Sequence, residues 1–336
     1  MKNILVVNVN WLGDCIFSSP VFKALKDNFP QAKVSCLAVP RVREILECIP
    51  HIDRIIIYDE KGAHRSWPAK WAFSQQLKKD AFDTAIILRP SFSRSMLLAA
   101  AGIPRRIGYA KKKRRSFLTQ PVPEPQGPLH RSDYYLRVLE SAGIKVKSRQ
   151  TVLVCDQKAQ EETNRILKEA GVNEDESFIA INPGGNWMLK RWPVQNYVAL
   201  IHEIEKTRPE KIVLTGGRED EELARHIQKE IKSPKLISLA GKTNLKQLMA
   251  LFKRASFLIS NDSGPLHIAN SVGTKAVGIF GPTRPEITAP RGPAEVYLLQ
   301  KDIGCNLVPC YYLDCPNNLC MQAVKVKDVL ETIGKI

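Results

Sequence analysis

Short apolar runs alternate with amphipathic stretches along almost the whole chain. In the first half we expect strands in ILVVNV, KVSCLAV, RIIIYD, DTAIILR and RRIGYA, and helices in REILECI, WAFSQQLKKD, SMLLAAAG and YYLRVLESAG. After TVLV the alternation begins again and is more regular, from EETNRILKEAG and FIAINPGG through to AVGIFG. This order is typical of α/β folds with parallel sheets. The pattern therefore predicts two Rossmann-like, doubly wound domains.

The length of the chain agrees with two domains. At 336 residues it exceeds most single cores, because about 150 residues is usual for one domain. We place the boundary near residues 145–157 and assign residues 1–155 to an N-terminal domain and residues 156–324 to a C-terminal domain. Residues 325–336, which contain KVKDVLETIGKI, are expected to form a terminal helix.

Composition narrows the class of protein. A hydrophobic content of 44% and a charged content of 25% are those of a soluble globular protein, and no apolar run approaches the roughly 18 to 20 residues of a membrane span. The opening MKNILVVNVN is too short and too soon broken by polar residues for a secretory signal. We therefore expect a cytoplasmic protein whose eight cysteines mostly stay reduced.

The net charge of +16 lies almost entirely in the first half. Residues 1–150 hold 26 basic and 12 acidic side chains, whereas residues 151–336 hold 24 and 22. The densest basic run is KKKRR, Lys111 to Arg115. It is either a solvated loop or a site for an anionic partner, and both nucleic acid and anionic lipid head groups fit the second alternative.

The stretch VNVNWLGDCIFSSP, residues 7–20, joins the first expected strand to a helix. Asp14 stands at that turn, where open α/β sheets bind their ligands. Aspartate is also among the best helix N-cap residues, so helix capping is the alternative to a role in chemistry.

Three loops of the second half point to an anionic ligand. NPGGNWMLKRWP (182–193), TGGRED (215–220) and NDSGPLHIAN (261–270) each follow an apolar strand and precede a helix. They should meet at the carboxyl edge of one parallel sheet, where free backbone N–H groups and helix N-termini favour phosphate. The chain lacks both G-x-G-x-x-G after its first strand and the P-loop pattern, so a common nicotinamide or P-loop site is not expected.

Together these motifs resemble glycosyltransferase family 9, the heptosyltransferases. WLGD with SSP, NPGG with KRWP, TGGRE, and NDSGPLHIAN-x-x-GT followed by GIFGPT occur in the same order as in that family, most like its heptosyltransferase II branch. The resemblance implies a GT-B architecture, with two Rossmann-like domains facing a central cleft. It also implies an inverting, metal-independent transfer of heptose from ADP-L-glycero-D-manno-heptose to the inner core of lipopolysaccharide, without a cofactor. The absence of an Asp-x-Asp pair from the sequence agrees with a metal-free reaction.

The resemblance assigns roles to individual residues. Asp14 falls on the catalytic general base, and Lys190 on a lysine that holds the donor phosphates and acts in catalysis. Glu219 and Thr243 fall on nucleoside contacts, although Gly185 and Asn186 stand where some relatives carry hydroxyl side chains. The expected donor-binding residues are Gly13, Gly185, Asn186, Lys190, Arg191, Glu219, Thr243, Asp262, Ser263, Gly264, Pro265 and His267. A buried hydrogen-bonding histidine is the alternative for His267.

The acceptor is expected to be the anionic, lipid A-linked core oligosaccharide, met by a monomer that is peripheral on the cytoplasmic face of the inner membrane. The expected acceptor-binding residues are Lys111, Lys112, Lys113, Arg114, Arg115 and His130. Two alternatives stay open: a family 9 transferase with another donor or acceptor, and a basic nucleic-acid-binding protein, against which stands the lack of a recognisable nucleic-acid motif.

The tail CNLVPCYYLDCPNNLC places Cys305, Cys310, Cys315 and Cys320 at five-residue intervals. Structural zinc sites usually space their paired cysteines by two to four residues, so these intervals are permissible but not typical for a metal site. Similar cysteines recur in the family branch without a required metal, so the resemblance implies reduced thiols or a local disulfide. By resemblance, the terminal helix that follows packs back on the N-terminal domain.

Overall fold

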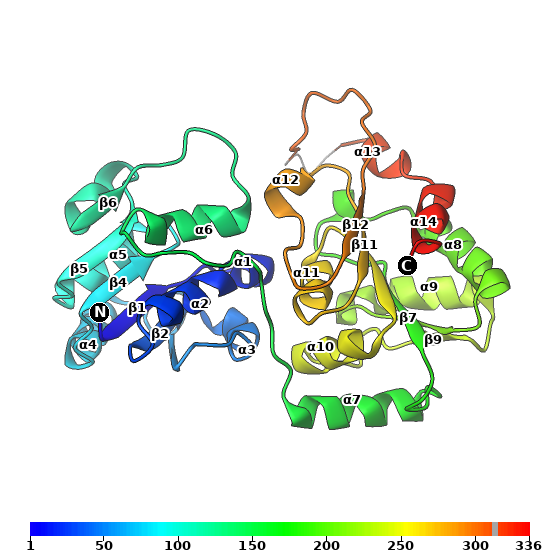
Figure 1. The fold of residues 1–336 in the computed structure, drawn as a ribbon, viewed down its shortest axis with the longest axis horizontal. Helices are drawn as coiled ribbons and strands as arrows, with labels where there is room; N and C mark the ends of the chain where they lie inside the picture. The colour runs from blue at the N-terminus through cyan, green and yellow to red at the C-terminus, as the bar shows by residue number, and fades with distance from the viewer. Residues whose placement is uncertain (311–314) are drawn as a thin grey trace. The chain divides into compact units, whose positions relative to one another are not determined.

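The computed structural model describes residues 1–310 and 315–336, except for the side chains of Lys112 and Lys113. The chain divides into two compact units, Met1–Leu153 (unit 1) and Val154–Ile336 (unit 2) (Figure 1). The division lies close to the expected boundary at residue 155, and each unit is described by itself below.

Unit 1 is built on a six-stranded parallel sheet with the order β3-β2-β1-β4-β5-β6. Its strands are β1 (Asn3–Val7), β2 (Lys33–Ala38), β3 (Arg54–Ile57), β4 (Thr84–Ile87), β5 (Arg105–Tyr109) and β6 (Gln120–Val122). The central strands β1 and β4 are apolar and almost wholly buried, as expected for a sheet covered on both faces. The strand order reverses between them, which is where doubly wound folds bind ligands.

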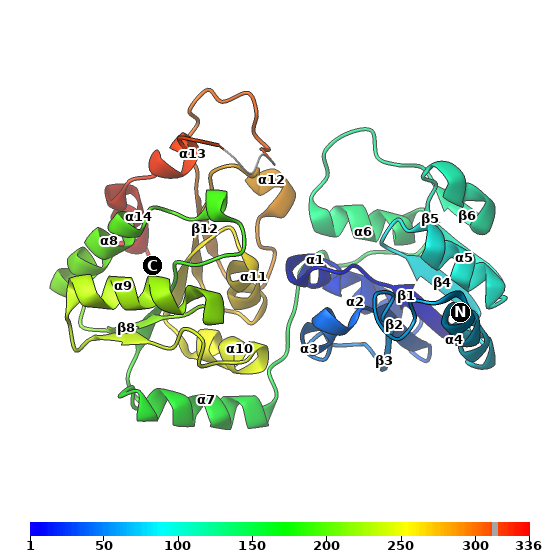
Figure 2. The ribbon, with the colours of Figure 1, turned by 180° about the vertical axis from the view of Figure 1, so that it is seen from behind.

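Helices cover this sheet on both sides (Figures 1 and 2). They are α1 (Leu12–Phe17), α2 (Ser19–Asn28), α3 (Arg43–Leu46), α4 (Trp67–Lys79), α5 (Phe92–Ala100) and α6 (Arg131–Glu140), with the short 3₁₀ helices η1 (Pro40–Val42) and η2 (Lys112–Phe117). Local sequence fixes several of their starts: Ser66 caps α4 by accepting from the amide of Ala69, and Ser91 caps α5 by accepting from that of Arg94.

Unit 2 repeats the same sheet topology, with the order β12-β11-β10-β7-β8-β9. Its strands are β7 (Phe178–Asn182), β8 (Lys211–Leu214), β9 (Leu236–Ser238), β10 (Phe257–Asn261), β11 (Ala276–Ile279) and β12 (Val296–Leu299), and all neighbours pair in parallel. The prediction of two Rossmann-like, doubly wound domains is therefore confirmed.

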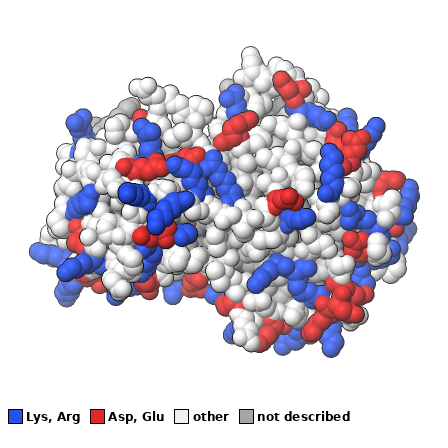
Figure 3. All heavy atoms as spheres, in the orientation of Figure 1, with Lys and Arg blue, Asp and Glu red and all other residues white. Residues whose placement is uncertain are grey.

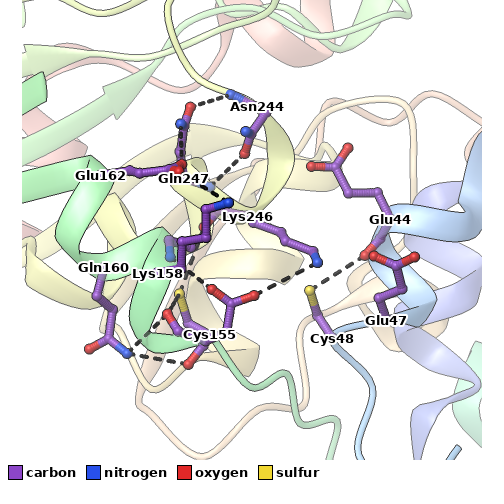
Figure 4. A network of polar contacts seen from close by, with 12 residues as sticks. Glu44, Glu47, Cys48, Cys155, Lys158, Gln160, Glu162, Asn244, Lys246 and Gln247 are labelled. Atoms are coloured by element: carbon purple, nitrogen blue, oxygen red, sulfur yellow. Dashed lines mark hydrogen bonds and ion pairs between the residues drawn. The ribbon is translucent and has the colours of Figure 1, made fainter.

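The helices of unit 2 pack around this sheet. They are α7 (Gln157–Glu169), α8 (Val194–Thr207), α9 (Glu221–Ile231), α10 (Leu245–Arg254), α11 (Gly264–Ser271), α12 (Pro285–Thr288), α13 (Leu319–Gln322) and α14 (Val326–Ile333), with the 3₁₀ helices η3 (Met188–Lys190) and η4 (Arg218–Asp220). A polar network joins α7 to α10 (Figure 4). In it Asn244 and Gln247 form a capping box at the start of α10, and the Gln247 amide donates to Glu162 of α7 at 3.0 Å.

The terminal helix α14 packs within unit 2, against α8. Its apolar residues Val329 and Ile333 are buried in the same core cluster as Leu200 and Ile204 of α8, and Arg208 donates to the carbonyl of Ile333. The expectation that this segment packs on the N-terminal domain is corrected accordingly: its apolar face is covered by the core of its own unit. In the described part of the chain, every helix is too short or too polar to cross a bilayer.

Candidate functional site

The three phosphate-type loops of unit 2 meet at the carboxyl edge of its sheet, because β10, β7 and β8 are neighbours there. Asn261, the last residue of β10, fixes the first loop: its side-chain amide donates to the carbonyls of Pro183 and Gly184 at 2.9 and 3.1 Å. Its Oδ1 accepts from the amide of Trp192 at 3.0 Å. Gly185 has φ +144°, and a Cβ there would lie 3.7 Å from that of Ser263. The loops after β7 and β10 therefore touch at the point where the strand order reverses.

Asp262 is the electrostatic centre of this edge. Its side chain is 3% exposed, and its Oδ2 accepts from Lys190 Nζ and from Thr283 Oγ1, both at 2.6 Å. His267 Nε2 lies 3.5 Å from the other carboxylate oxygen. Burial alone would raise the pKa of Asp262, but His267 and Lys190 outweigh burial and hold that pKa well below its usual range. A fixed negative charge therefore orients Lys190 and His267 beside the start of α11.

Arg191 is held by the first two loops together. Its Nε donates to the carbonyl of Gly185 at 2.8 Å, and its guanidinium bonds Asp220 Oδ1 at 3.1 Å. Asp220 is 4% exposed and lies so close to Gly184 and Gly216 that a Cβ at either would collide with it. Glycine is therefore required on both sides of this carboxylate. Sequence reasoning passed over Asp220 in favour of its neighbour Glu219, although the two glycine pairs around it were a usable signal.

The other expected donor-site residues line the same edge or lie near it. Ser263 is the N-cap of α11, and Gly264 and Pro265, both half-buried, begin that helix. His267 is buried one turn further, as the buried alternative expects, and its part in donor binding stays a prediction. Asn186 and Glu219 are exposed, and Thr243 is half-buried just before the N-cap of α10. Positively charged side chains, helix N-terminal amides and glycine backbone give this edge the chemistry of a pyrophosphate site.

Asp14 lies at the equivalent edge of unit 1, just beyond β1. The N-cap position of α1 is Trp11, so Asp14 is the third residue of the helix and the capping alternative is wrong. Its Oδ1 instead accepts a hydrogen bond of 2.9 Å from the hydroxyl of Tyr135 on α6. Burial, reinforced by Asp14, raises the pKa of Tyr135 well above its usual value, so the hydroxyl keeps its proton. A half-buried carboxylate preceded by Gly13 is thus held in one orientation.

Two arginines that the sequence did not single out flank the start of α1. Arg41 lies over the exposed ring of Trp11, 4.0 Å from its centroid, and donates to the carbonyl of Asn10 at 2.7 Å. Arg94 is 1% exposed and donates to the carbonyl of Asn8 at 3.2 Å while pairing with Glu60 at 3.1 Å. Neither residue belongs to a recognisable motif, so only the fold brings them to this edge.

The expected acceptor residues separate into surface and core. Lys111 pairs with Glu124 at 3.1 Å and Arg115 is exposed, whereas Arg114 is 5% exposed and donates to the carbonyl of Tyr109 at 2.6 Å. His130 is also buried: it caps α6 by accepting from the amide of Ser132 at 3.1 Å, and it packs edge-on against Phe17. Arg114 and His130 are therefore buried and bonded within unit 1, and their part in acceptor binding stays a prediction. The side chains of Lys112 and Lys113 lie outside the described residues.

The four tail cysteines are free thiols in the described structure. Together with Leu189 and Pro282 they line a cavity of about 430 Å³. Burial raises the pKa of the Cys320 thiol. Among the residues that the structure describes, no three His, Cys, Asp or Glu side chains are grouped so as to hold a metal ion. Residues Tyr311 to Asp314, between Cys310 and Cys315, lie outside the described part.

The family of the chain follows from comparison with known proteins. The model of glycosyltransferase family 9 (heptosyltransferase) matches residues 70–310, which include all three loops of the unit 2 edge. The chain belongs to glycosyltransferase family 9. It is therefore a glycosyltransferase, and membership of this family favours the enzyme over the nucleic-acid-binding alternative.

Relatives with known names match this chain over most of its length. Lipooligosaccharide heptosyltransferase 2 of Campylobacter jejuni is 25% identical over 331 residues, which is 97% of this chain and 96% of the relative. Lipopolysaccharide heptosyltransferase 2 of Salmonella typhimurium is 25% identical over 296 residues, 85% of each chain.

Solved structures share the fold at low sequence identity. A family 9 glycosyltransferase from Veillonella parvula superposes with a TM-score of 0.86 at 24% identity, covering 99% of this chain and 96% of its own. The ADP-heptose lipopolysaccharide heptosyltransferase II of E. coli gives 0.79 at 22%, covering 100% and 98%. The E. coli heptosyltransferase WaaC with ADP gives 0.75 at 16%, covering 99% of both chains. The two-sheet architecture of this chain is thus that of GT-B heptosyltransferases.

Proposed function

We propose that this glycosyltransferase moves a heptose from ADP-L-glycero-D-manno-heptose to the inner core of lipopolysaccharide, with inversion and without a metal, in the manner of heptosyltransferase II. The names of its relatives support the sugar and the acceptor, and a related structure with ADP supports the nucleotide. The single observation that carries the mechanism is the carboxylate of Asp14, which is free of helix capping and held by Tyr135.

In this mechanism Asp14 accepts the proton of the acceptor hydroxyl as its oxygen attacks the anomeric carbon of heptose. The bond between that carbon and the β-phosphate oxygen breaks, and ADP leaves with the electron pair. Inversion follows because the nucleophile enters opposite the leaving group. A positioned general base contributes roughly 10² to 10⁴ in rate, and its carboxylate must be ionised to act.

The charge that develops on ADP is met by unit 2. Lys190 and Arg191 supply two cations, and the amides at the start of α11 supply oriented hydrogen-bond donors. Asp262 accepts a hydrogen bond of 2.6 Å from Lys190 Nζ and so keeps this lysine beside the start of α11. Ser263 follows Asp262 in the same loop. These groups take the place that a divalent cation holds in metal-dependent transferases. We expect EDTA to leave the transfer rate unchanged, and chelator inhibition relieved by magnesium would contradict this part of the proposal.

The experiment that tests the proposal is a donor and acceptor screen read by mass spectrometry. The full chain is incubated with ADP-heptose, other ADP-sugars and UDP-sugars, each with deep-core lipopolysaccharide acceptors. The proposal expects a mass gain of one heptose with ADP-heptose only. Transfer of another sugar, or to another acceptor alone, would favour the alternative of a family 9 enzyme with different substrates.

The proposal includes the place of action. The acceptor is lipid-linked and anionic, so the enzyme would work at the cytoplasmic face of the inner membrane, held there as a peripheral protein. The proposal further includes that the enzyme works as a monomer. The excess of basic residues in residues 1–150 supports an attraction of unit 1 to that surface.

A further inference from the structure

Unit 1 exposes large aromatic side chains on one helix. Trp67 and Trp71, one turn apart on α4, are 70% and 63% exposed, while Phe73 and Leu77 on the other side of that helix are buried in the core. Tryptophans separated by four positions lie on the same helix face. An indole of this exposure leaves a large apolar area in water, which marks a surface for interaction.

The aromatic surface continues from α4 to α5 and η2. A small cavity is lined jointly by Trp67, Trp71 and Met96, so the two tryptophans border α5. Phe92 at the start of α5 is 47% exposed and packs edge-on against Phe117 of η2, with ring centroids 5.3 Å apart. Figure 2 shows α4 and α5 beside one another on the same side of the first sheet. We name Trp67, Trp71, Phe92, Met96 and Phe117 the aromatic strip.

The sequence around the aromatic strip is strongly basic. Residues 60–124 contain 14 Lys and Arg against four acidic residues, Glu60, Asp80, Asp83 and Glu124. Lys61, Arg65, Lys78 and Arg115 are exposed, and Lys70 Nζ lies 5.2 Å from the centroid of the Trp67 ring. Figure 3 draws one face of the molecule, on which acidic and basic side chains are interspersed.

We propose that the aromatic strip and its exposed cations form the surface by which unit 1 docks on an anionic lipid bilayer. Indole rings partition to the interface between water and hydrocarbon, and lysine and arginine next to them attract acidic head groups. A single-stranded nucleic acid would also use the cations and stack its bases on the indoles, but the chain has no recognisable nucleic-acid motif and belongs to a glycosyltransferase family. This inference names the surface of the enzyme that faces the membrane. It rests on the proposed function in one respect, namely that the acceptor is linked to a membrane lipid.

The test is vesicle binding by the full-length chain. The probes are vesicles of phosphatidylcholine alone and of phosphatidylcholine with a minority of phosphatidylglycerol, with brominated acyl chains that quench inserted indoles. Trp67→Ser/Trp71→Ser removes the indoles, and Arg65→Gln/Lys78→Gln removes two cations from the same region. Lys158→Gln/Arg165→Gln is the matched control, because it removes two exposed cations from α7 in unit 2.

The wild type should bind the anionic vesicles, with quenched tryptophan emission, far better than the neutral ones. The double tryptophan variant should lose quenching and bind at least about tenfold more weakly. The Arg65/Lys78 variant should also bind about tenfold more weakly, since each cation near an anionic surface contributes substantially. The control should stay within about twofold of the wild type, since its cations belong to α7 of unit 2 and are not part of this surface.

The proposal is overturned if the tryptophan variant binds anionic vesicles as tightly as the wild type, or if the control loses as much affinity as the Arg65/Lys78 variant. A second arm separates this outcome from a failure of the proposed function. Transfer to a deacylated, water-soluble core acceptor should be unchanged in the tryptophan variant, which should have the wild-type melting temperature. Absence of heptose transfer by the wild type would refute the function, while the vesicle result would still be read independently.

Discussion

The hydroxyl of Tyr135 donates to Asp14 Oδ1 at 2.9 Å, although 121 positions separate the two residues in sequence. Tyr135 is 4% exposed, so α6 fixes its ring and the hydrogen bond in turn fixes the carboxylate in the first turn of α1. The proposed base is therefore positioned by a residue that need not touch the substrate.

Removal of that hydroxyl tests the positioning role. Tyr135→Phe should lower kcat by about tenfold, since a hydrogen bond to a charged group is lost, and should leave the KM for ADP-heptose unchanged. Initial rates at varied ADP-heptose concentration measure kcat and KM separately, and the melting temperature of the variant reports on its folding. An unchanged kcat in the folded variant would contradict the positioning role of Tyr135.

The pairing of Lys190 with Asp262 leads to a second prediction. Lys190→Ala should weaken ADP binding by about tenfold or more and lower turnover, because a cation beside the phosphates is lost. Calorimetry with ADP and initial rates measure the two parts. Lys206→Ala, which removes an exposed lysine of α8, is the control and should bind ADP like the wild type. Unchanged ADP affinity in Lys190→Ala would move the phosphate-binding role to Arg191.

Acid stability should report the buried charge of Asp262. Its pKa is lower in the folded chain than the ordinary aspartate value of about 3.9, so ionised Asp262 stabilises the fold fully above that value. This stabilisation is lost as the pH falls through the folded-state pKa. Asp262→Asn should therefore cost about 1 to 3 kcal/mol of unfolding free energy at neutral pH, and less at strongly acidic pH. Urea unfolding at several pH values measures the difference, and a cost that does not change with pH would contradict the assignment.

The basic run from Lys111 to Arg115 contains both exposed residues and the buried Arg114. Lys111→Gln/Arg115→Gln should raise the KM for a core acceptor about three- to tenfold at low salt and leave the KM for ADP-heptose unchanged, because both side chains face solvent. The rise should shrink at high salt. Arg114→Gln should instead lower the melting temperature, since it breaks the bond to Tyr109. Equal acceptor KM and salt dependence in wild type and Lys111/Arg115 variant would make the run a solvated loop.

Alternation of strands and helices was enough to predict both sheets, because a parallel sheet requires such crossovers and places every strand's carboxyl end at one edge. The gathering of Lys190, Asp262 and Gly185 follows from that rule. The contact of Tyr135 with Asp14 does not, because periodicity gives the buried face of a helix but not its partner across the fold. The position of a helix start was also uncertain by a few residues, which is why Asp14 could be taken for an N-cap.

Burial of individual polar residues was the second limit. In KKKRR every side chain looks solvated, yet the turn of η2 directs Arg114 back toward Tyr109. Asp220 was likewise missed in favour of its exposed neighbour Glu219, although it is Asp220 that bonds Arg191. The packing of α14 on α8 depends on which apolar surface is left uncovered, and sequence pattern does not give that surface.

The central claim is that Asp14 is the general base of heptose transfer, and the most direct measurement is the turnover of Asp14→Asn with ADP-heptose and a core acceptor. Asparagine preserves the shape of the side chain but cannot accept the proton. We predict a loss of kcat of at least about 100-fold, with ADP affinity and melting temperature close to those of the wild type. Turnover above about a tenth of the wild-type value in the folded variant would contradict the claim.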